Sequence, residues 1–494
     1  MQSRRDQVQA HMFVMGRLST GLFRDDPDAA DPPHRRTTKG VVIGLVIGAL
    51  VALVVTVYGV IVPGGADNWK KPGTLVVDED TGARYISLDG VLHPVLNQTS
   101  AKLLAGDRMR LETLSSASIA KAPRGSTVGI VGAPDALPRP GALTRDPWSA
   151  CAVLPPRKGS DPVPDAASSR LVLGVGLPVQ GRPVTSDRAT LVRAATGHDT
   201  YLLWHGTRMR LNTDHAAAQA LGYGDTAAYP VPDGFLNALP AGPDIASPDV
   251  PDLGAKGPEL AGRPTKVGQL FGAADGRRFL LRKEGLTPVT GLEFALLKGD
   301  PRTQHTAYDG GAVDVRQVGP DDLERHRAPA APPLVGGAGG GVPGSPPKAM
   351  PVKLGEAVCA VTESGDRAPS VSVVLPQASA IDGHPPSREP GLTADSRTAD
   401  GVAVRPGKGA LAVSLSSSGA GGTYYLVTES GAKYPLVGAD GPQQLGYDPA
   451  HAVRMPSALL GMLATGPTLD AKALQSRGLV QPPSGPKGRA ASGS

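Results

Sequence analysis

An unbroken apolar run near the beginning of the chain dominates its hydrophobic pattern. Val41 to Val62 reads VVIGLVIGALVALVVTVYGVIV, 22 residues without a charge or a proline. A helix of that length is roughly 33 Å long, enough to cross a hydrocarbon core of about 30 Å. We therefore expect one transmembrane helix over residues 41–62, since a lone segment satisfies its backbone in lipid only as a helix. The 40 residues before the run and the absence of a clear cleavage site disfavour a signal peptide.

Basic residues lie closer to the N-terminal end of this run than to its other end. Arg35, Arg36 and Lys39 directly precede the run, whereas Lys70 and Lys71 follow it several residues later. Cytoplasmic flanks of membrane helices are enriched in Lys and Arg. The pattern predicts a single-pass protein of the inner cell membrane, with its N-terminus in the cytoplasm and the bulk of the chain outside.

Apolar residues also recur at helical spacing before the membrane segment. They form one stripe and comprise Val8, Met12, Met15, Leu18 and Leu22. From the residues alone two interpretations are equally good. The helix lies on the inner membrane surface, or its stripe docks another subunit.

Beyond the membrane segment a pattern of about 35 residues occurs four times. Each copy reads as an apolar strand, a polar turn, a second strand with an aromatic residue, a turn glycine, a Pro-Val-like step and a short helix. The copies are Gly73–Leu104, Ala189–Gly222, Val267–Gly299 and Gly409–Gly446. The aromatic residues are Tyr85, Tyr201, Phe279 and Tyr424 or Tyr425, and the turn glycines are Gly90, Gly206, Gly285 and Gly431.

The intervals between the copies contain strongly apolar strands, and two of these carry the only cysteines, Cys151 and Cys359. In an oxidising space outside the cytoplasm they favour one disulfide, which would contribute roughly 5 kcal/mol by closing a loop of about 200 residues. Two buried free thiols are the alternative. The fold class expected is a single-pass membrane protein with an α+β extracytoplasmic region, in which a disulfide-stapled β-rich core carries four small αβ repeat domains.

This organisation divides the chain into ten segments. We expect a cytosolic helix and linker over 1–40, the transmembrane helix over 41–62, repeat 1 over 63–110, the first core part over 111–185, repeat 2 over 186–230, a linker and repeat 3 over 231–310, a flexible Gly/Pro-rich insertion over 311–350, the second core part over 351–405, repeat 4 with a return segment over 406–470, and a disordered tail over 471–494.

Several kinds of chemistry find little support in the sequence. A net charge of +5 is too small for this length to indicate nucleic-acid binding. No G-x-x-x-x-G-K-[ST] loop or G-x-S-x-G elbow is present, and the nearest phosphate-loop fragment is Arg405-Pro-Gly-Lys408-Gly409. We expect no catalytic, cofactor-binding or metal-binding residues. The histidines beside the repeats (His93, His198, His205 and His215) indicate surface positions, and the acidic tip Asp78-Glu79-Asp80 indicates a solvated turn rather than a cation site.

Several of these segments together resemble the EccB family of actinobacterial type VII secretion systems. They are RDQVQAHMFVMGRL at Arg5–Leu18, the apolar run, NWKKPGTLVVDEDTGARYISLDGVLHPVLN at Asn68–Asn97, GIVGAPDALP at Gly129–Pro138, and the paired cysteines. The resemblance extends from about residue 3 to about residue 470 and is most specific in the first third. The chain departs from the family's common pattern at Met12, and its second repeat lacks the Pro-Val step.

The resemblance implies a subunit of an inner-membrane secretion complex that includes the EccC, EccD and EccE components. It implies that the cytosolic helix contacts other subunits and that the outer domains associate with one another and stabilise the assembly. A cell-wall (peptidoglycan) binding module is the second hypothesis, although only Trp148 and Trp204 supply tryptophan to the outer domain for glycan contact. An ATP hydrolase, as the family is sometimes described, is the third.

Overall fold

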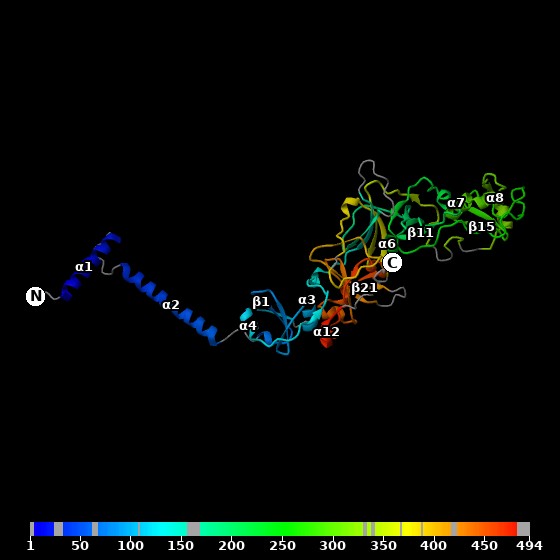
Figure 1. Ribbon diagram of the computed structural model, residues 1–494. Helices are drawn as coiled ribbons and strands as arrows, with labels where there is room; N and C mark the ends of the chain where they lie inside the picture. Colours follow the sequence, from blue (N-terminus) through cyan, green and yellow to red (C-terminus); the bar gives the residue numbers. More distant parts are fainter. Residues whose placement is uncertain are drawn as a thin grey trace, which may run out of the picture.

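The computed structural model describes residues 4–23, 33–61, 68–106, 109–155, 168–329, 333–336, 341–365, 368–386, 389–415 and 422–481. Two long helices, α1 (Arg4–Phe23) and α2 (Pro33–Ile61), lie apart from a β-rich body (Figure 1). The side chains of Thr37–Tyr58 in α2 are all exposed, and the most apolar 18 residues of this segment have a mean hydropathy of 2.9. Exposed apolar side chains in such number suit lipid rather than water. Helix α2 contains residues 41–61 of the predicted span, and Val62 lies outside the described residues. It is the one candidate membrane helix among the described residues.

The body begins with a four-stranded sheet that we call unit 1 (residues 74–130). Its strands are β1 (Thr74–Asp78), β2 (Arg84–Leu88), β3 (Val91–Pro94) and β4 (Arg110–Leu114), in the spatial order β3-β2-β1-β4. The first three strands are antiparallel neighbours, and β4 runs parallel to β1. A parallel return needs a crossover connection, which the helix α3 (Gln98–Ala105) supplies.

Three further sheets repeat this strand order, and in each the fourth strand of the unit runs parallel to the first. Unit 2 (residues 188–245) contains β9 (Arg188–Ala194), β10 (Thr200–Trp204), β11 (Thr207–Leu211), α5 (Ala217–Ala220), β12 (Tyr229–Val231) and α6 (Asp233–Asn237). Unit 3 (residues 270–328) contains β13 (Leu270–Gly272), β14 (Arg278–Arg282), β15 (Gly285–Val289), α7 (Gly291–Gly299), α8 (Pro301–Ala307), β16 (Arg316–Gln317) and α9 (Pro320–Arg325). Unit 4 (residues 410–469) contains β21 (Ala410–Leu415), β22 (Tyr424–Val427), β23 (Ala432–Leu436), α10 (Gly441–Gln444), β24 (Val453–Pro456), α11 (Ser457–Gly461) and β25 (Ala464–Thr465).

The second and third strands of the four units share one register. The aromatic residue of the second strand stands opposite the proline of the third in three units, and opposite arginine in unit 2. These pairs are Tyr85 with Pro94, Tyr201 with Arg210, Phe279 with Pro288, and Tyr425 with Pro435. The predicted Pro-Val-like step is therefore the end of a third strand. Proline is tolerated there because no backbone N–H is needed at that position.

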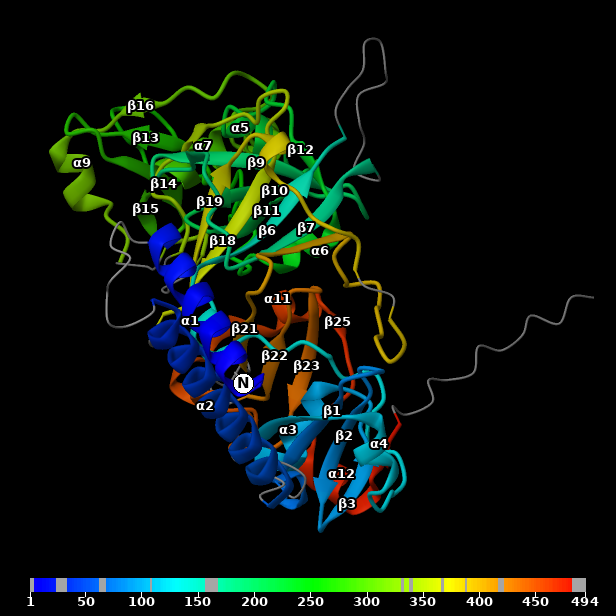
Figure 2. The same cartoon turned by 90° about the vertical axis from the view of Figure 1, so that its left-hand side faces the viewer.

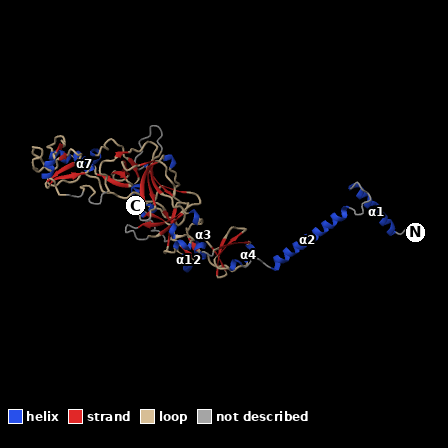
Figure 3. Cartoon of the chain, turned by 180° about the vertical axis from the view of Figure 1, so that it is seen from behind, coloured by secondary structure: helices blue, strands red, loops and turns tan. Residues whose placement is uncertain are grey.

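A six-stranded sheet forms the middle of the body. Its order is β20 (Gly401–Val404), β7 (Arg170–Val175), β6 (Trp148–Val153), β18 (Val358–Glu363), β19 (Ser370–Leu375) and β8 (Arg182–Pro183). Strands β6, β7 and β18 are almost continuously buried, which explains their unbroken apolar sequences. Figure 3 shows that strands fill the body and that its helices are short.

Buried apolar clusters fix the order of the units in space. One cluster, which includes Leu103 and Leu411, joins units 1 and 4. A second, which includes Trp148, Val192 and Met455, joins the central sheet to units 2 and 4. A third, which includes Leu202 and Leu296, joins units 2 and 3. The spatial order is thus unit 1, unit 4, central sheet, unit 2 and unit 3. Figure 2 shows units 1 and 4 at one end of the body and units 2 and 3 at the other.

The predicted segment boundaries cut through several of these sheets. The boundary at residue 110 falls on the first residue of β4, and the one at residue 230 falls inside β12. The Gly/Pro-rich segment 311–350, predicted as a flexible insertion, contains β16, α9 and β17 (Lys348–Ala349), and its Val335 is buried. Its residues 330–332 and 337–340 lie outside the described residues. Long-range strand pairing, which leaves little local signal, accounts for these differences.

The predicted disordered tail begins too early. Residues Ala471–Arg477 form α12, and Leu479–Val480 form β26, which pairs with β5 (Gly129–Ile130) of unit 1. Asp470 caps the helix through its carboxylate, and Leu474 is completely buried. The end of the described chain therefore returns to unit 1, and residues 482–494 lie outside the described residues.

Candidate assembly site

The stripe predicted for docking lies on one exposed face of α1. Its members Val8, Met12, Met15, Leu18 and Leu22 are between 56% and 81% exposed. Arg4 and His11 continue the same alternating spacing of three and four residues, so the apolar face also carries basic groups. Phe13 and Val14 are exposed as well, and the Arg17 guanidinium lies 5.7 Å from the centre of the Phe13 ring. The described body covers none of the five predicted residues.

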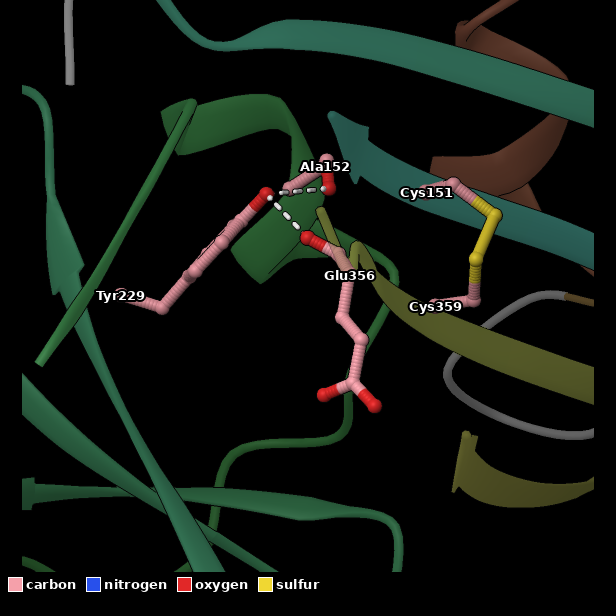
Figure 4. The surroundings of a disulfide bond; sticks show 5 residues. All are labelled: Cys151, Ala152, Tyr229, Glu356 and Cys359. Atoms are coloured by element: carbon pink, nitrogen blue, oxygen red, sulfur yellow. Dashed lines mark hydrogen bonds between the residues drawn. A yellow bond between two sulfur atoms is a disulfide. The ribbon is translucent and has the colours of Figure 1, made fainter. Parts of the chain in front are cut away.

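The two cysteines form a disulfide between neighbouring strands of the central sheet (Figure 4). Cys151 on β6 stands directly opposite Cys359 on β18. Both side chains are buried, and their apolar neighbours include Val361, Val374 and Ile381. The bond that the sequence predicted is therefore part of the hydrophobic core, and the alternative of two free thiols is wrong for this structure.

An ion pair between the partly exposed Arg182 and the buried Glu356 carboxylate lies beside the disulfide and had no signal in the sequence. The Arg182 guanidinium donates two hydrogen bonds to the Glu356 carboxylate, at 2.8 and 2.5 Å. The Lys353 amide donates a third at 2.8 Å. The Glu356 side chain is only 4% exposed, and hydrogen bonding from Arg182 lowers the pKa of this carboxyl below its ordinary value. The pair ties the short strand β8 to the segment that enters β18.

Tyr229 joins unit 2 to the same place. Its hydroxyl lies 3.4 Å from the Ala152 carbonyl oxygen and 3.3 Å from that of Glu356 (Figure 4). The same hydroxyl accepts a hydrogen bond from the Leu154 amide. Burial raises the pKa of Tyr229 to about 12, so the phenol remains a donor at physiological pH. A single hydroxyl of β12 thus contacts β6, the residue Leu154 that follows it, and the approach to β18.

The turn glycines of units 2 and 4 form contacts with the central sheet. Gly206 has a φ of +69°, and a Cβ atom there would lie 1.9 Å from the Val371 carbonyl oxygen of β19. Gly431 has a φ of +76°, and its Cβ would lie 2.9 Å from the Val402 side chain of β20. Gly90 of unit 1 has open space around the same position. Glycine at Gly206 and Gly431 therefore permits both the turn and the docking of each unit.

A buried lysine stabilises unit 4 internally. Lys433 on β23 is 8% exposed, and its ammonium donates to the carbonyl oxygens of Leu460 at 2.5 Å and Leu463 at 3.1 Å. These carbonyls belong to the end of α11 and the residues after it, where helices leave acceptors without internal partners. Burial lowers the pKa of Lys433 to about 8.

Other candidate residues have structural roles. Asp78 is buried and accepts hydrogen bonds from the Ser116 hydroxyl and the Asp80 amide. Across the described ranges, no group of three His, Cys, Asp or Glu side chains could hold a metal ion. Trp148 is completely buried in the core and cannot contact a glycan, and the Trp204 indole donates to the Ser186 carbonyl.

Comparisons with known proteins agree with this architecture. The family model EccB, described as type VII secretion system ESX-1, transport TM domain B, matches residues 1–481. The ESX-3 secretion system ATPase EccB3 of Mycolicibacterium smegmatis is 29% identical over 94% of this chain and 89% of its own length. The ESX-2 secretion system ATPase EccB2 of Mycobacterium tuberculosis is 28% identical over 94% of this chain and 93% of its own length.

Solved structures share the fold. The EccB3 dimer from the ESX-3 core complex has a TM-score of 0.60 and 26% identity, covering 81% of this chain and 98% of the EccB3 chain. A chain of the intact ESX-5 inner membrane complex has a TM-score of 0.60 and 23% identity, covering 96% of this chain and 95% of its own. The second likeness concerns the fold alone.

Proposed function

The chain belongs to the EccB family of type VII secretion systems, and we propose that it acts there as a structural membrane subunit that anchors and stabilises the secretion complex on its extracytoplasmic side. The observation that carries the proposal is a family match from the first helix to residue 481. The match includes both the single membrane helix and the multi-unit body, so the whole arrangement is preserved and not one domain alone.

We propose that the N-terminus lies in the cytoplasm and the body outside it. The basic residues before the span support this orientation, and so does the disulfide in the core of the body. Disulfides form and persist in oxidising compartments and are rare in the cytosol.

Helix α1 is then the cytosolic contact of the subunit. Its exposed stripe of Val8, Met12, Met15, Leu18 and Leu22 would bury its apolar area against another membrane component of the EccC, EccD or EccE type. Seven-residue spacing of the kind found in α1 suits helix-on-helix packing.

We propose that the four units that share one strand order are the four repeat domains of the subunit. Each unit alone buries little apolar surface, and each contacts a neighbour through a shared cluster, as expected for small repeats docked on a core. The extended body offers several faces for self-association, and the related EccB3 is described as a dimer.

We further propose that this subunit does not itself hydrolyse ATP, although related proteins carry the name ATPase. A phosphate-binding loop places its lysine at the start of a helix, where amide groups cradle phosphate. In this chain Lys408 and Gly409 lead into strand β21 instead. Energy for transport would come from another subunit.

Removal of the subunit tests the structural role. In cells lacking this chain, the remaining membrane components should run on a native gel as a smaller or dispersed species, and secretion should stop. Full-length protein should restore both the size of the complex and secretion. An unchanged complex in the deletion strain would contradict the proposal.

A further inference from the structure

A polar cavity of about 210 Å³ lies beside the central sheet, where the strands β7 and β20 end. Its wall includes residues from three separate segments: Thr144, Arg145 and Asp146 before β6, Gly176 after β7, and Arg405 and Lys408 between β20 and β21. Because β7 and β20 are parallel neighbours, their ends bring the second and third segments together.

Backbone hydrogen bonds hold two of these segments against each other. The Thr144 amide donates to the Gly409 carbonyl at 2.8 Å, and the Lys408 amide donates to the Arg405 carbonyl at 3.0 Å to close a turn. The Arg145 guanidinium donates to the Ala450 carbonyl at 2.7 Å, which fixes its direction. The basic side chains are therefore carried by a rigid backbone rather than by free loops.

Gly176 completes the wall of the cavity. It has a φ of +63°, and a Cβ atom there would lie 2.2 Å from the Thr144 methyl carbon. Only glycine allows the chain to leave β7 this close to Thr144. The contact joins the segment after β7 to the segment before β6, so all three segments are connected.

The charges of the cavity are not balanced. Arg145, Arg405 and Lys408 form no ion pair with any other described residue, and Asp146 is the one acidic side chain among the lining residues. Among the lining residues, three cations and one carboxylate leave a net charge of about +2 at neutral pH. Outside the lining, the Glu429 carboxylate accepts a hydrogen bond from the Gly407 amide, in the turn between Arg405 and Lys408. Cations gathered without counter-ions repel one another, and a bound anion removes that repulsion.

We propose that this cavity binds a phosphate group with two negative charges, either free inorganic phosphate or a phosphate monoester. The charge of such a group, about −1.5 to −2 at neutral pH, matches that of the cavity. Guanidinium groups donate paired hydrogen bonds to phosphate oxygens, and the lysine adds a point charge. The site is a binding site without hydrolysis and does not depend on the scaffold role proposed above.

The test is a calorimetric titration of the full chain in detergent with inorganic phosphate, in a buffer free of other oxyanions. We expect saturable binding that weakens as chloride is added, because salt screens exposed charges. The double variant Arg405→Gln/Lys408→Gln should bind phosphate at least about tenfold more weakly. The matched double variant Lys121→Gln/Lys298→Gln changes exposed charges on units 1 and 3 by the same amount and should bind like the wild type.

Further ligands distinguish the sources of phosphate. Glycerol phosphate, a monoester, should bind within a few fold of inorganic phosphate, whereas dimethyl phosphate, a diester with one charge, should bind at least about tenfold more weakly. No detectable binding of inorganic phosphate at about 10 mM would overturn the proposal. So would equal affinity in the Arg405/Lys408 variant whose circular dichroism matches that of the wild type, or binding of ATP without any binding of inorganic phosphate.

Discussion

Cys151 and Cys359 lie directly opposite each other on the antiparallel neighbours β6 and β18, and the bond between their sulfur atoms joins positions 208 residues apart in the chain. Units 2 and 3, residues 188–328, lie wholly within the loop that this bond closes. The chain leaves the central sheet after β8 to form these two units and re-enters it at β18, so the bond ties the strand of re-entry to β6.

Substitution of one cysteine should weaken the central sheet. We expect Cys151→Ser to lower the stability of the body by about 2–5 kcal/mol, because a long loop is released in the unfolded chain. Thermal denaturation of the purified chain, followed by circular dichroism with and without reductant, measures the effect. Cys359→Ser should show the same loss, and reductant should lower the midpoint of the wild type alone. Identical wild-type melting in both conditions would refute this role.

The ion pair of Arg182 with the buried Glu356 carboxylate should make stability depend on acid pH. We expect Arg182→Met to cost about 3–5 kcal/mol at neutral pH, because it leaves a buried carboxylate without its cation. Arg210→Met breaks an exposed pair with Asp244 and should cost less than about 1 kcal/mol. Urea denaturation of both variants and the wild type measures the costs.

The sign of this pH effect follows from the pKa of Glu356. Arg182 lowers that pKa in the folded state, so the folded chain holds its proton less strongly than the unfolded chain. The stability from the pair is complete above the ordinary carboxyl pKa and is lost as pH falls through the lowered value. The difference between wild type and Arg182→Met should shrink in acid, and a constant difference from pH 7 to pH 3 would be inconsistent with the assignment.

Gly206 and Gly90 offer a matched test of unit docking. Both have positive φ angles, but only Gly206 lies against another backbone, at Val371. Gly90→Ala should cost only the strain of a left-handed residue, about 1 kcal/mol. Gly206→Ala should cost distinctly more and should expose β19 and β11 to hydrogen exchange, since unit 2 must move away. Equal losses in the two variants would show that docking does not depend on this approach.

The stripe on α1 should be needed for assembly and not for insertion. We expect Met15→Asp to leave the amount of membrane-bound protein unchanged and to reduce the large complex on a native gel, because it places a charge in the apolar face. Gln9→Asp adds the same charge outside the stripe, about 120° around the helix from Met15, and should assemble normally. Normal complex size for Met15→Asp would count against a docking role.

Lys433 should give unit 4 a distinct response to alkaline pH. Burial lowers its pKa from 10.5 to about 8, so between these values the unfolded chain binds more protons than the folded chain. The stability of the wild type relative to Lys433→Met should therefore rise as pH increases from 8 to 10, by up to about 1.4 kcal/mol per pH unit. Melting midpoints across that range provide the measurement. A relative fall would mean that the bonds from the ammonium to Leu460 and Leu463 outweigh the cost of burial.

Local sequence patterns predicted the parts of the fold that depend on nearby residues. The apolar run of α2, the first two strands of each unit and the apolar strands around both cysteines were all visible in the sequence. The disulfide was also predictable, because the chain has two cysteines and both follow the membrane segment. The exposed stripe on α1 was found by its spacing, and its docking role stays a prediction.

Features that depend on distant partners were not predictable. Strand β4 reads RLETL and forms because β1 lies beside it, and β26 forms because β5 is available. The third strands of units 1, 3 and 4 were obscured by their prolines. Neither Arg182 nor Glu356 stands in a recognisable motif, and their pairing depends on β8 lying at the edge of the central sheet. The cavity beside Gly176 likewise combines three segments that only the folded chain brings together.

The most direct test of the scaffold role is purification of the tagged full-length chain from its own membranes in mild detergent, with the co-eluting proteins identified by mass spectrometry. The account predicts a large assembly that contains a translocase with several ATPase domains and a membrane subunit with many spans. Recovery of the chain alone, or bound only to cell-wall fragments, would contradict the scaffold role and favour wall binding.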